Sequence, residues 1–281
     1  MSHSNLRVVE TGRPWPPRFA SGRPAVMGIV NVTADSFSDG GRFLEASRAI
    51  EHGLRLRDEG ADLVDIGGES TRPGAQPVPL DEERRRVIPV VEALVREGVA
   101  VSVDTMKPTL MREAIEAGCA MVNDVNAFRA EGAVEAITAR RVAVCVMHMQ
   151  GEPATMQSQP RYGDVVAEVS AFLRARAAAL EAAGVLHEAI VLDPGFGFGK
   201  TLEHNAALFR ALPKLAALGY PVLAGLSRKR TLGEITGRPV EERLAASVAA
   251  ALLAVQNGAS FVRVHDVKET VDAIKTWMAL R

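Results

Sequence analysis

Several apolar segments of the sequence end in side chains that could bind a polar ligand. The residues concerned are Asp104, Asn123, Asp193 and Lys229. A polar side chain at the end of a buried segment needs a partner. A carboxylate can pair in bidentate fashion with an N–C(=N)–N edge, and a lysine can donate to a ring carbonyl or nitrogen. The set predicts a site for a nitrogen heterocycle, with Met147 and Phe198 packing on the faces of the ring.

Cationic side chains at other segment ends predict an anion site. Arg263 and His265 lie two residues apart, so their side chains point the same way if they share a strand. Together with Arg72 and Asn31 they predict a cradle for phosphate or diphosphate. His148 has no second ligand at metal-binding spacing, so a pure His/Cys metal site is not expected. Any metal would be Mg²⁺, held by substrate phosphates and one or two oxygen ligands.

The hydrophobic pattern predicts the elements that bring these residues together. Apolar, β-branched runs that are nearly continuous are typical of parallel strands covered on both faces. Eight such runs are found, at 25–32, 62–66, 99–103, 120–122, 142–147, 189–192, 220–224 and 260–264. Amphipathic stretches fill most of the gaps, at 44–59, 81–97, 109–117, 165–183, 205–218, 241–256 and 268–280.

Strands that alternate with helices in this way predict an α/β fold, a (β/α)₈ TIM barrel. We expect one barrel domain over residues 25–281, and an N-terminal extension over residues 1–24 that could cover the barrel bottom as a hairpin. Active sites of such barrels lie at the C-terminal ends of the strands. The polar residues above fall at those ends, which favours an enzyme.

Composition excludes other classes of protein. The 281 residues are 47% hydrophobic and 24% charged, which is an ordinary globular mixture. Lys+Arg number 33 and Asp+Glu 34, so a general grip on nucleic acid or an anionic membrane is not expected. Cys119 and Cys145 lack CxxC spacing and fit small core residues in a reducing compartment. With no signal-peptide or membrane-spanning run, we expect a cytoplasmic location.

Taken together, the motifs resemble the dihydropteroate synthase family of folate biosynthesis, whose members are pterin-binding TIM barrels. The resemblance covers most of residues 26–277. It rests on eight segments in order: MGIVNVT at 27–33, DSFSDGG at 35–41, DIGGESTRPG at 65–74, SVDT at 102–105, NDV at 123–125, LDPGFGF at 192–198, GLSRK at 225–229 and VRVHD at 262–266.

The resemblance implies a transferase of an alkyl group other than methyl. It would condense 6-hydroxymethyl-7,8-dihydropterin diphosphate with 4-aminobenzoate, giving 7,8-dihydropteroate and diphosphate. Diphosphate is a good leaving group once Mg²⁺ and cations neutralise it. Its dissociative departure would leave a cationic methylene that the Asp104 carboxylate can stabilise. The polar loops after the first two strands would then close as lids that exclude water.

The resemblance also implies a role for each site residue. The catalytic residues would be Asp104, Lys229 and Arg72. The pterin would contact Thr71, Asp104, Asn123, Met147, Asp193, Phe198, Gly225 and Lys229. The diphosphate would contact Asn31, Arg72, Arg263 and His265, with Asn31 also a ligand of Mg²⁺. The 4-aminobenzoate would contact Phe37, Thr71, Pro73 and Ser227.

Three alternatives are weighed against this function. A methyltetrahydrofolate-dependent methyltransferase shares the pterin grip but needs neither the diphosphate cradle nor the Ser227–Lys229 loop. A non-catalytic pterin-binding paralogue is expected to lose Asn31, Arg72 or His265, and none is lost. A sugar-phosphate barrel would leave the carboxylates at the strand ends unexplained.

The family resemblance carries two further expectations. Related barrels are commonly homodimers, and the segments 241–256 and 268–280 are candidates for the interface. Sulfonamides mimic 4-aminobenzoate, so the site is an expected sulfonamide target.

Overall fold

The computed structural model describes residues 23–32, 39–71, 74–153 and 155–281. Its strands are β1 Ala25–Asn31, β2 Leu63–Gly67, β3 Val101–Asp104, β4 Met121–Asp124, β5 Ala143–Met147, β6 Ile190–Asp193, β7 Leu223–Ala224 and β8 Phe261–Val264. Its α-helices are α1 Asp39–Asp58, α2 Leu80–Arg96, α3 Pro108–Glu116, α4 Ala133–Thr138, α5 Val165–Ala182, α6 Leu202–Arg210, α7 Leu212–Ala216, α8 Arg230–Thr236, α9 Leu244–Gln256 and α10 Val267–Leu280. Two 3₁₀ turns, His187–Ala189 and Val240–Glu242, precede β6 and α9.

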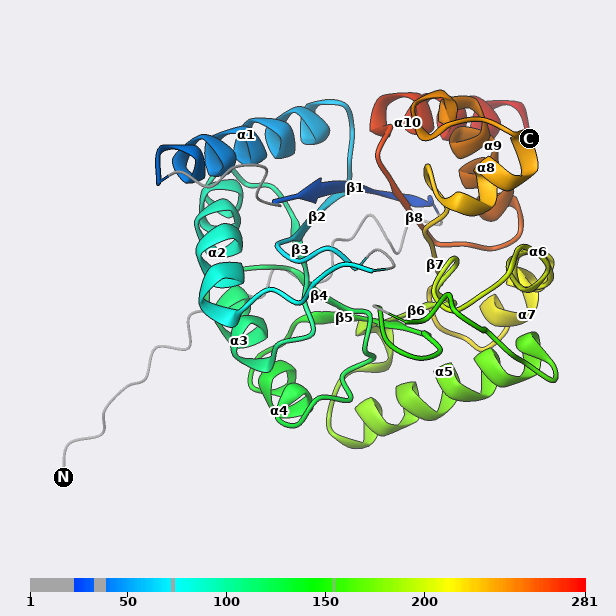
Figure 1. Cartoon of the computed structure of the whole chain (residues 1–281), viewed down its shortest axis with the longest axis horizontal. Helices are drawn as coiled ribbons and strands as arrows, with labels where there is room; N and C mark the ends of the chain where they lie inside the picture. The colour runs from blue at the N-terminus through cyan, green and yellow to red at the C-terminus, as the bar shows by residue number, and fades with distance from the viewer. Residues whose placement is uncertain (1–22, 33–38, 72–73, 154) are drawn as a thin grey trace.

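The eight strands form one parallel sheet in the order β6-β5-β4-β3-β2-β1-β8-β7. The sheet curls into a barrel with the helices around its outside (Figure 1). The seam between β6 and β7 is closed by a single parallel bridge between Leu192 and Val222. The Leu192 amide also donates to the Pro221 carbonyl at 2.9 Å. This architecture confirms the predicted TIM barrel.

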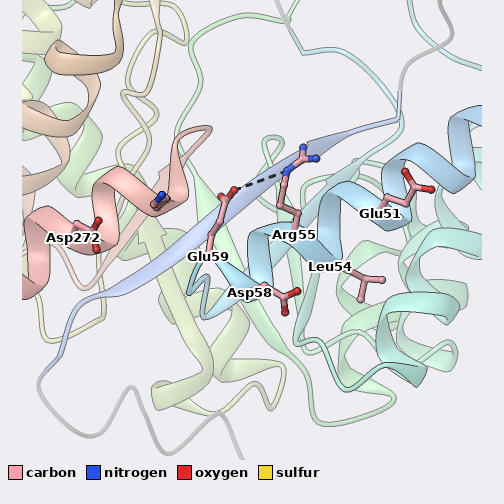
Figure 2. Close-up of a pocket in the computed structure, with 7 residues that line it drawn as sticks. Glu51, Leu54, Arg55, Asp58, Glu59 and Asp272 are labelled. Carbon is pink, nitrogen blue, oxygen red and sulfur yellow. Dashed lines mark ion pairs between the residues drawn. The ribbon is translucent and has the colours of Figure 1, made fainter.

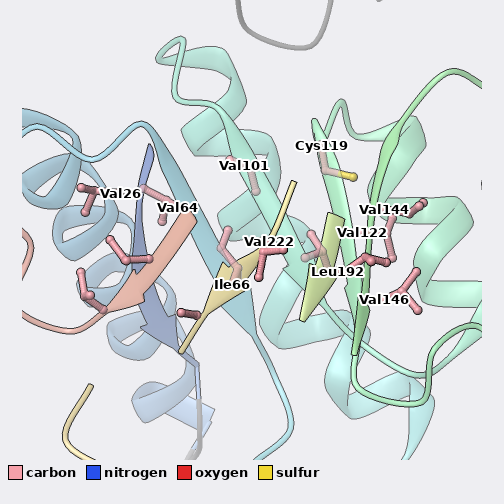
Figure 3. Packing of buried hydrophobic residues seen from close by; sticks show 14 of the residues in the cluster. Val26, Val64, Ile66, Val101, Cys119, Val122, Val144, Val146, Leu192 and Val222 are labelled. Atoms are coloured by element: carbon pink, nitrogen blue, oxygen red, sulfur yellow. The ribbon is translucent and has the colours of Figure 1, made fainter. Parts of the chain in front are cut away.

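Alternation along the strands divides the apolar core into two parts. One part lies between strands and helices, where Val64, Ile66 and Val122 are buried (Figure 3). The other fills the barrel interior and includes Met27, Met121 and Phe261. Side chains nearer the C-terminal strand ends continue this interior column but are polar. The apolar interior is therefore a floor beneath the candidate site.

Local chemistry explains where the elements differ from the sequence prediction. The helix expected at 205–218 is divided into α6 and α7, because Pro213 has no N–H to continue the α-helical ladder. The seventh strand begins at Leu223 rather than at residue 220, because Pro221 has no N–H to donate to a neighbouring strand. The short helices α4 and α8 were not predicted, since six or seven residues give too little periodicity.

The predicted N-terminal extension lies outside the described residues except for its last two positions. There, Arg23 forms an ion pair with Asp62, whose other oxygen accepts from the Val26 amide at 3.0 Å. Among the described residues, none of the helices is both long enough and apolar enough to span a bilayer.

Candidate active site at the barrel mouth

Strand register places the predicted heterocycle-binding residues at one end of the barrel. Gly67 of β2 is level with Asp104 of β3, and Asp104 is level with Asn123 of β4. On the far side, Met147 of β5 is level with Asp193 of β6. All are at or near the C-terminal ends of their strands, so β3, β4 and β6 bring polar groups to one arc at the barrel mouth, and β5 brings Met147 to the same arc.

An arginine bridges two carboxylates inside this arc. The Arg263 Nε donates to Asp65 Oδ2 at 2.6 Å, and its Nη2 donates to Asp104 Oδ2 at 3.2 Å. Asn123 Nδ2 donates to the same Asp65 oxygen at 3.1 Å. Four elements, β2, β3, β4 and β8, are thus tied together by one network. The expectation that Arg263 binds diphosphate stays a prediction, because its guanidinium here lies between two carboxylates.

The network shifts the proton affinities of its members. Desolvation, followed by the negative charge of Asp65, raises the pKa of Asp104 to about 7. The Arg263 charge opposes this shift. Burial alone would lower the pKa of Arg263, but the two carboxylates outweigh it and raise that pKa above its usual value. The guanidinium stays charged, whereas Asp104 is poised to change its protonation near neutral pH.

A second carboxylate and a lysine face each other across the seam between β6 and β7. Asp193 Oδ1 accepts from the Gly195 amide at 2.7 Å. Lys229 Nζ donates to the Phe196 carbonyl at 2.6 Å and lies 4.7 Å from the centroid of the Phe198 ring. Desolvation raises the pKa of Asp193 and lowers that of Lys229 to about 8, while each charge partly stabilises the other. This pair can offer both an acceptor and a donor to a ligand.

The loop after β6 is held close to the loop after β5. Gly195 has a φ of +67°, and a Cβ added there would lie 1.9 Å from the His148 carbonyl oxygen. Lys200 Nζ lies 3.0 Å from both His148 Nδ1 and the Phe198 carbonyl oxygen. Desolvation lowers the pKa of this buried lysine to about 7. Met147 and Phe198 share one apolar cluster beside these loops, and their packing on the faces of a ligand ring stays a prediction.

The residues expected to hold anions are only partly brought together. His265 is joined to Ser227, whose Oγ lies 3.1 Å from both the His265 amide nitrogen and its Nδ1. Asn31 ends β1 with an exposed side chain, and Thr71 is half-buried. Arg72, Phe37 and Pro73, all predicted site residues, lie outside the described residues. Gly225 lies beside Lys229, since a Cβ added there would be 3.8 Å from Lys229 Nζ.

Sequence reasoning missed two features that support the site. Asp65 is fully buried in β2, and its signal was an aspartate between Val64 and Ile66, inside an apolar run. Lys107 forms ion pairs with Glu69 and with the buried Glu83. This second cluster fastens the beginning of the loop after β2 to the N-terminal half of α2.

The described residues offer few oxygen donors that could hold Mg²⁺. Among the described residues there is no group of three or more His, Cys, Asp or Glu side chains that could hold a metal. The exposed Asn31 side chain offers one amide oxygen at the barrel mouth. One protein oxygen fits Mg²⁺, which is commonly held through one or two protein ligands and the phosphates of a substrate.

A surface groove on the outside of the barrel is separate from this site. Its residues are Glu51, Leu54, Arg55, Asp58, Glu59, Lys268 and Asp272, from α1 and α10 (Figure 2). The Arg55–Glu59 ion pair, at 3.9 Å, lies along it. Its lining comes from α1, the residue after it and α10, and none of the site residues above takes part.

Comparison with known proteins gives a consistent result. Residues 27–265 match the family model described as pterin binding enzyme. A dihydropteroate synthase of Neisseria meningitidis serogroup B is 52% identical, with 92% of this chain and 93% of that protein covered. A solved dihydropteroate synthase of Xanthomonas albilineans with 4-aminobenzoic acid is 57% identical, with a TM-score of 0.86 and coverage of 92% and 93%. The Yersinia pestis dihydropteroate synthase with a sulfonamide drug complex is 46% identical, with a TM-score of 0.86 and coverage of 92% and 94%.

Proposed function

The chain belongs to the dihydropteroate synthases of the pterin-binding enzyme family, and from this premise we propose how its barrel mouth works. The reaction joins 6-hydroxymethyl-7,8-dihydropterin diphosphate to 4-aminobenzoate and releases 7,8-dihydropteroate and diphosphate. The methyltetrahydrofolate-dependent alternative is not favoured, because relatives of about half identical sequence are dihydropteroate synthases.

One observation carries the assignment of the pterin site. The polar ends of β3, β4 and β6 and the lysine after β7 surround the same mouth, above an apolar floor. Asp104 and Asp193 offer carboxylate oxygens to the amine and ring N–H groups of a pterin, and Lys229 offers a donor to its carbonyl or ring nitrogen. Met147 and Phe198 supply the apolar faces. This complementarity supports the pterin roles of these five residues.

The chemistry needs charge stabilisation more than a strong base. The C–O bond between the pterin methylene and the diphosphate breaks, and its electron pair leaves with the diphosphate. The methylene becomes cationic and conjugated with the pterin ring, and the ionised Asp104 lies where it can stabilise that charge. The arylamine nitrogen then forms the new C–N bond and releases a proton to solvent.

The leaving diphosphate is assigned to Asn31, Arg72, Arg263 and His265. Mg²⁺, bound by Asn31 and the diphosphate oxygens, would neutralise the charge of the leaving group. His265 is held in place by its contact with Ser227, which supports a joint position beside both substrates. The 4-aminobenzoate is assigned to Phe37, Thr71, Pro73 and Ser227, and sulfonamides are expected to compete there.

A direct assay tests the proposal. Purified protein is mixed with the pterin diphosphate and Mg²⁺, with and without 4-aminobenzoate, and both products are measured. We expect coupled formation of dihydropteroate and diphosphate, and a loss of about 100- to 1,000-fold in Asp193→Ala. Asp272→Ala, at an exposed residue of α10, is the matched control and should keep wild-type activity. Absence of dihydropteroate from the wild-type reaction would refute the proposed function.

The dissociative order of bond breaking has its own test. Without 4-aminobenzoate, water should capture the methylene cation slowly, so diphosphate should still be released along with the hydroxymethyl dihydropterin. Strict dependence of diphosphate release on the arylamine would instead indicate direct displacement.

We propose a homodimer and a cytoplasmic location for the enzyme. Leu253 and Leu244 of α9 and Ile235 of α8 are 49%, 39% and 63% exposed, although they are large and apolar. Such a surface on neighbouring helices is typical of an interface, and a second copy of the chain is the partner we infer. The buried free thiols of Cys119 and Cys145 support a reducing compartment.

A further inference from the structure

Asp65 is a charged group in a place where charge is costly. It lies within β2 and is 0% exposed. The neighbouring side chains in the barrel interior, which come from the surrounding strands, form the apolar floor. Burying an ion pair adds little net stability compared with apolar residues of the same volume. A carboxylate at this position therefore needs a reason other than folding.

The contacts of Asp65 lead to Asn123 of the proposed pterin site and to Arg263, which is assigned to the diphosphate. Its Oδ2 accepts from Arg263 Nε at 2.6 Å and from Asn123 Nδ2 at 3.1 Å. A carboxylate can only accept, so it fixes which end of the Asn123 amide turns toward it. It also fixes the plane of the guanidinium, because Nε is held on one side while Nη2 reaches Asp104 at 3.2 Å.

Asp65 also changes the charge balance of the interior. Around Arg263, Asp65 and Asp104 are two carboxylates that share one guanidinium, so one negative charge is in excess among these three groups when all are ionised. Without Asp65, Arg263 would neutralise Asp104 alone. With it, the guanidinium is shared between the two carboxylates and pairs less fully with Asp104.

We propose that Asp65 is a positioning residue for the condensation reaction. It orients the guanidinium of Arg263 and the amide of Asn123 and divides the guanidinium between two carboxylates. This inference rests on the proposed function, since it assumes that the arc of polar groups binds the pterin.

The test uses Asp65→Asn, which keeps the shape of the side chain and removes its charge. The matched control is Ser102→Ala, at the residue level with Asp65 on β3, whose buried hydroxyl has no hydrogen-bond partner among the described residues. Binding of the pterin diphosphate is measured by calorimetry, and turnover is measured in parallel. D65N should weaken pterin binding and kcat/KM by about tenfold to a hundredfold, with the KM for 4-aminobenzoate unchanged. S102A should match the wild type.

The pH profile separates positioning from a merely structural role. Asp104 faces Asp65, Arg263, Asp124, Glu83 and Lys229. Removing the charge of Asp65 takes a negative charge away from Asp104 and leaves Arg263 to pair with Asp104 alone. Both changes lower the pKa of Asp104, so the pH at which kcat/KM falls on the acid side should move about one unit lower. An unchanged limb, with wild-type binding, would overturn the inference.

Two further arms keep the outcomes distinct. If D65N does not fold, D65N/R263Q removes both charges together and is compared with R263Q alone. Equal pterin binding in these two proteins supports action through Arg263, a further loss in the double variant supports action through Asn123, and tighter binding in the double variant refutes the inference. Because pterin binding is measured without turnover, an inactive wild-type protein would refute the proposed function while leaving the role of Asp65 in binding still testable.

Discussion

Alanine at Gly195 would disturb the point where the loops after β5 and β6 touch. The backbone at Gly195 has a φ of +67°, and a Cβ built there lies 1.9 Å from the carbonyl oxygen of His148. The obstacle is backbone, so no side chain can rotate away. The Gly195 amide also donates to Asp193 Oδ1 at 2.7 Å, so any shift of the loop moves a proposed pterin ligand.

The size of the effect can be worked out from these contacts. Left-handed backbone costs an alanine about 1 kcal/mol. Forcing a methyl group into a packed position adds about 1–3 kcal/mol, so Gly195→Ala should lose about 3 kcal/mol of folding free energy. The control is Gly184→Ala, where φ is +100° but nothing lies within 4 Å of the added Cβ. Only the backbone cost of about 1 kcal/mol applies there.

Thermal unfolding and turnover measure the two consequences. At about 2–4 °C per kcal/mol, the Tm should fall by about 6–12 °C in G195A and by about 2–4 °C in G184A. The kcat/KM for the pterin diphosphate should fall about tenfold or more in G195A only. Equal Tm values for the two variants, or wild-type activity in G195A, would show that the loops do not constrain Asp193 as argued.

Three other predictions follow from charge and exposure. Because the pKa of Asp104 is raised to about 7 and that of Lys229 is lowered to about 8, kcat/KM should fall below about pH 7 as the carboxylate is protonated and above about pH 8 as the lysine is neutralised. A flat profile between pH 6 and pH 9 would contradict this. Leu253→Glu should convert the proposed dimer to a monomer in light scattering, whereas Leu186→Glu, at a residue of similar exposure, should not. Lys107→Met would leave the buried Glu83 without its cationic partner and should lower the free energy of unfolding by about 3–5 kcal/mol. Urea unfolding measures this loss, and an unchanged midpoint would refute the role of this ion cluster.

The barrel and most of its site could be predicted because both depend on local signals. Apolar runs bounded by polar residues identify strands and their ends, and in a parallel barrel those ends meet. Asp104, Asn123 and Asp193 were selected by that rule, and each is the last or next-to-last residue of its strand. The division between α6 and α7 was missed although Pro213, in the middle of the predicted stretch 205–218, signals a break in an α-helix.

Pairing across the barrel could not be read from the chain. Arg263 and Asp65 are 198 residues apart, and nothing local to either predicts their contact. Asp65 lies inside an apolar strand rather than at its end, so a rule based on strand ends passes over it. The contact of Ser227 with His265 is of the same kind, since it depends on the pairing of β7 with β8 and not on the sequence next to either residue.

The seam of the barrel has a consequence for motion. β7 contributes two residues to the sheet, and one bridge joins this part of the chain to β6, so opening fluctuations should be easiest there. Asp193 and Lys229 stand on opposite sides of that seam. A pterin that contacts both residues would bridge β6 and the loop after β7, where only one backbone bridge joins the two sides of the seam. Its binding should slow amide hydrogen exchange at Leu192 and Val222 more than elsewhere in the sheet. Substrate recognition and closure of the cylinder would then be a single event.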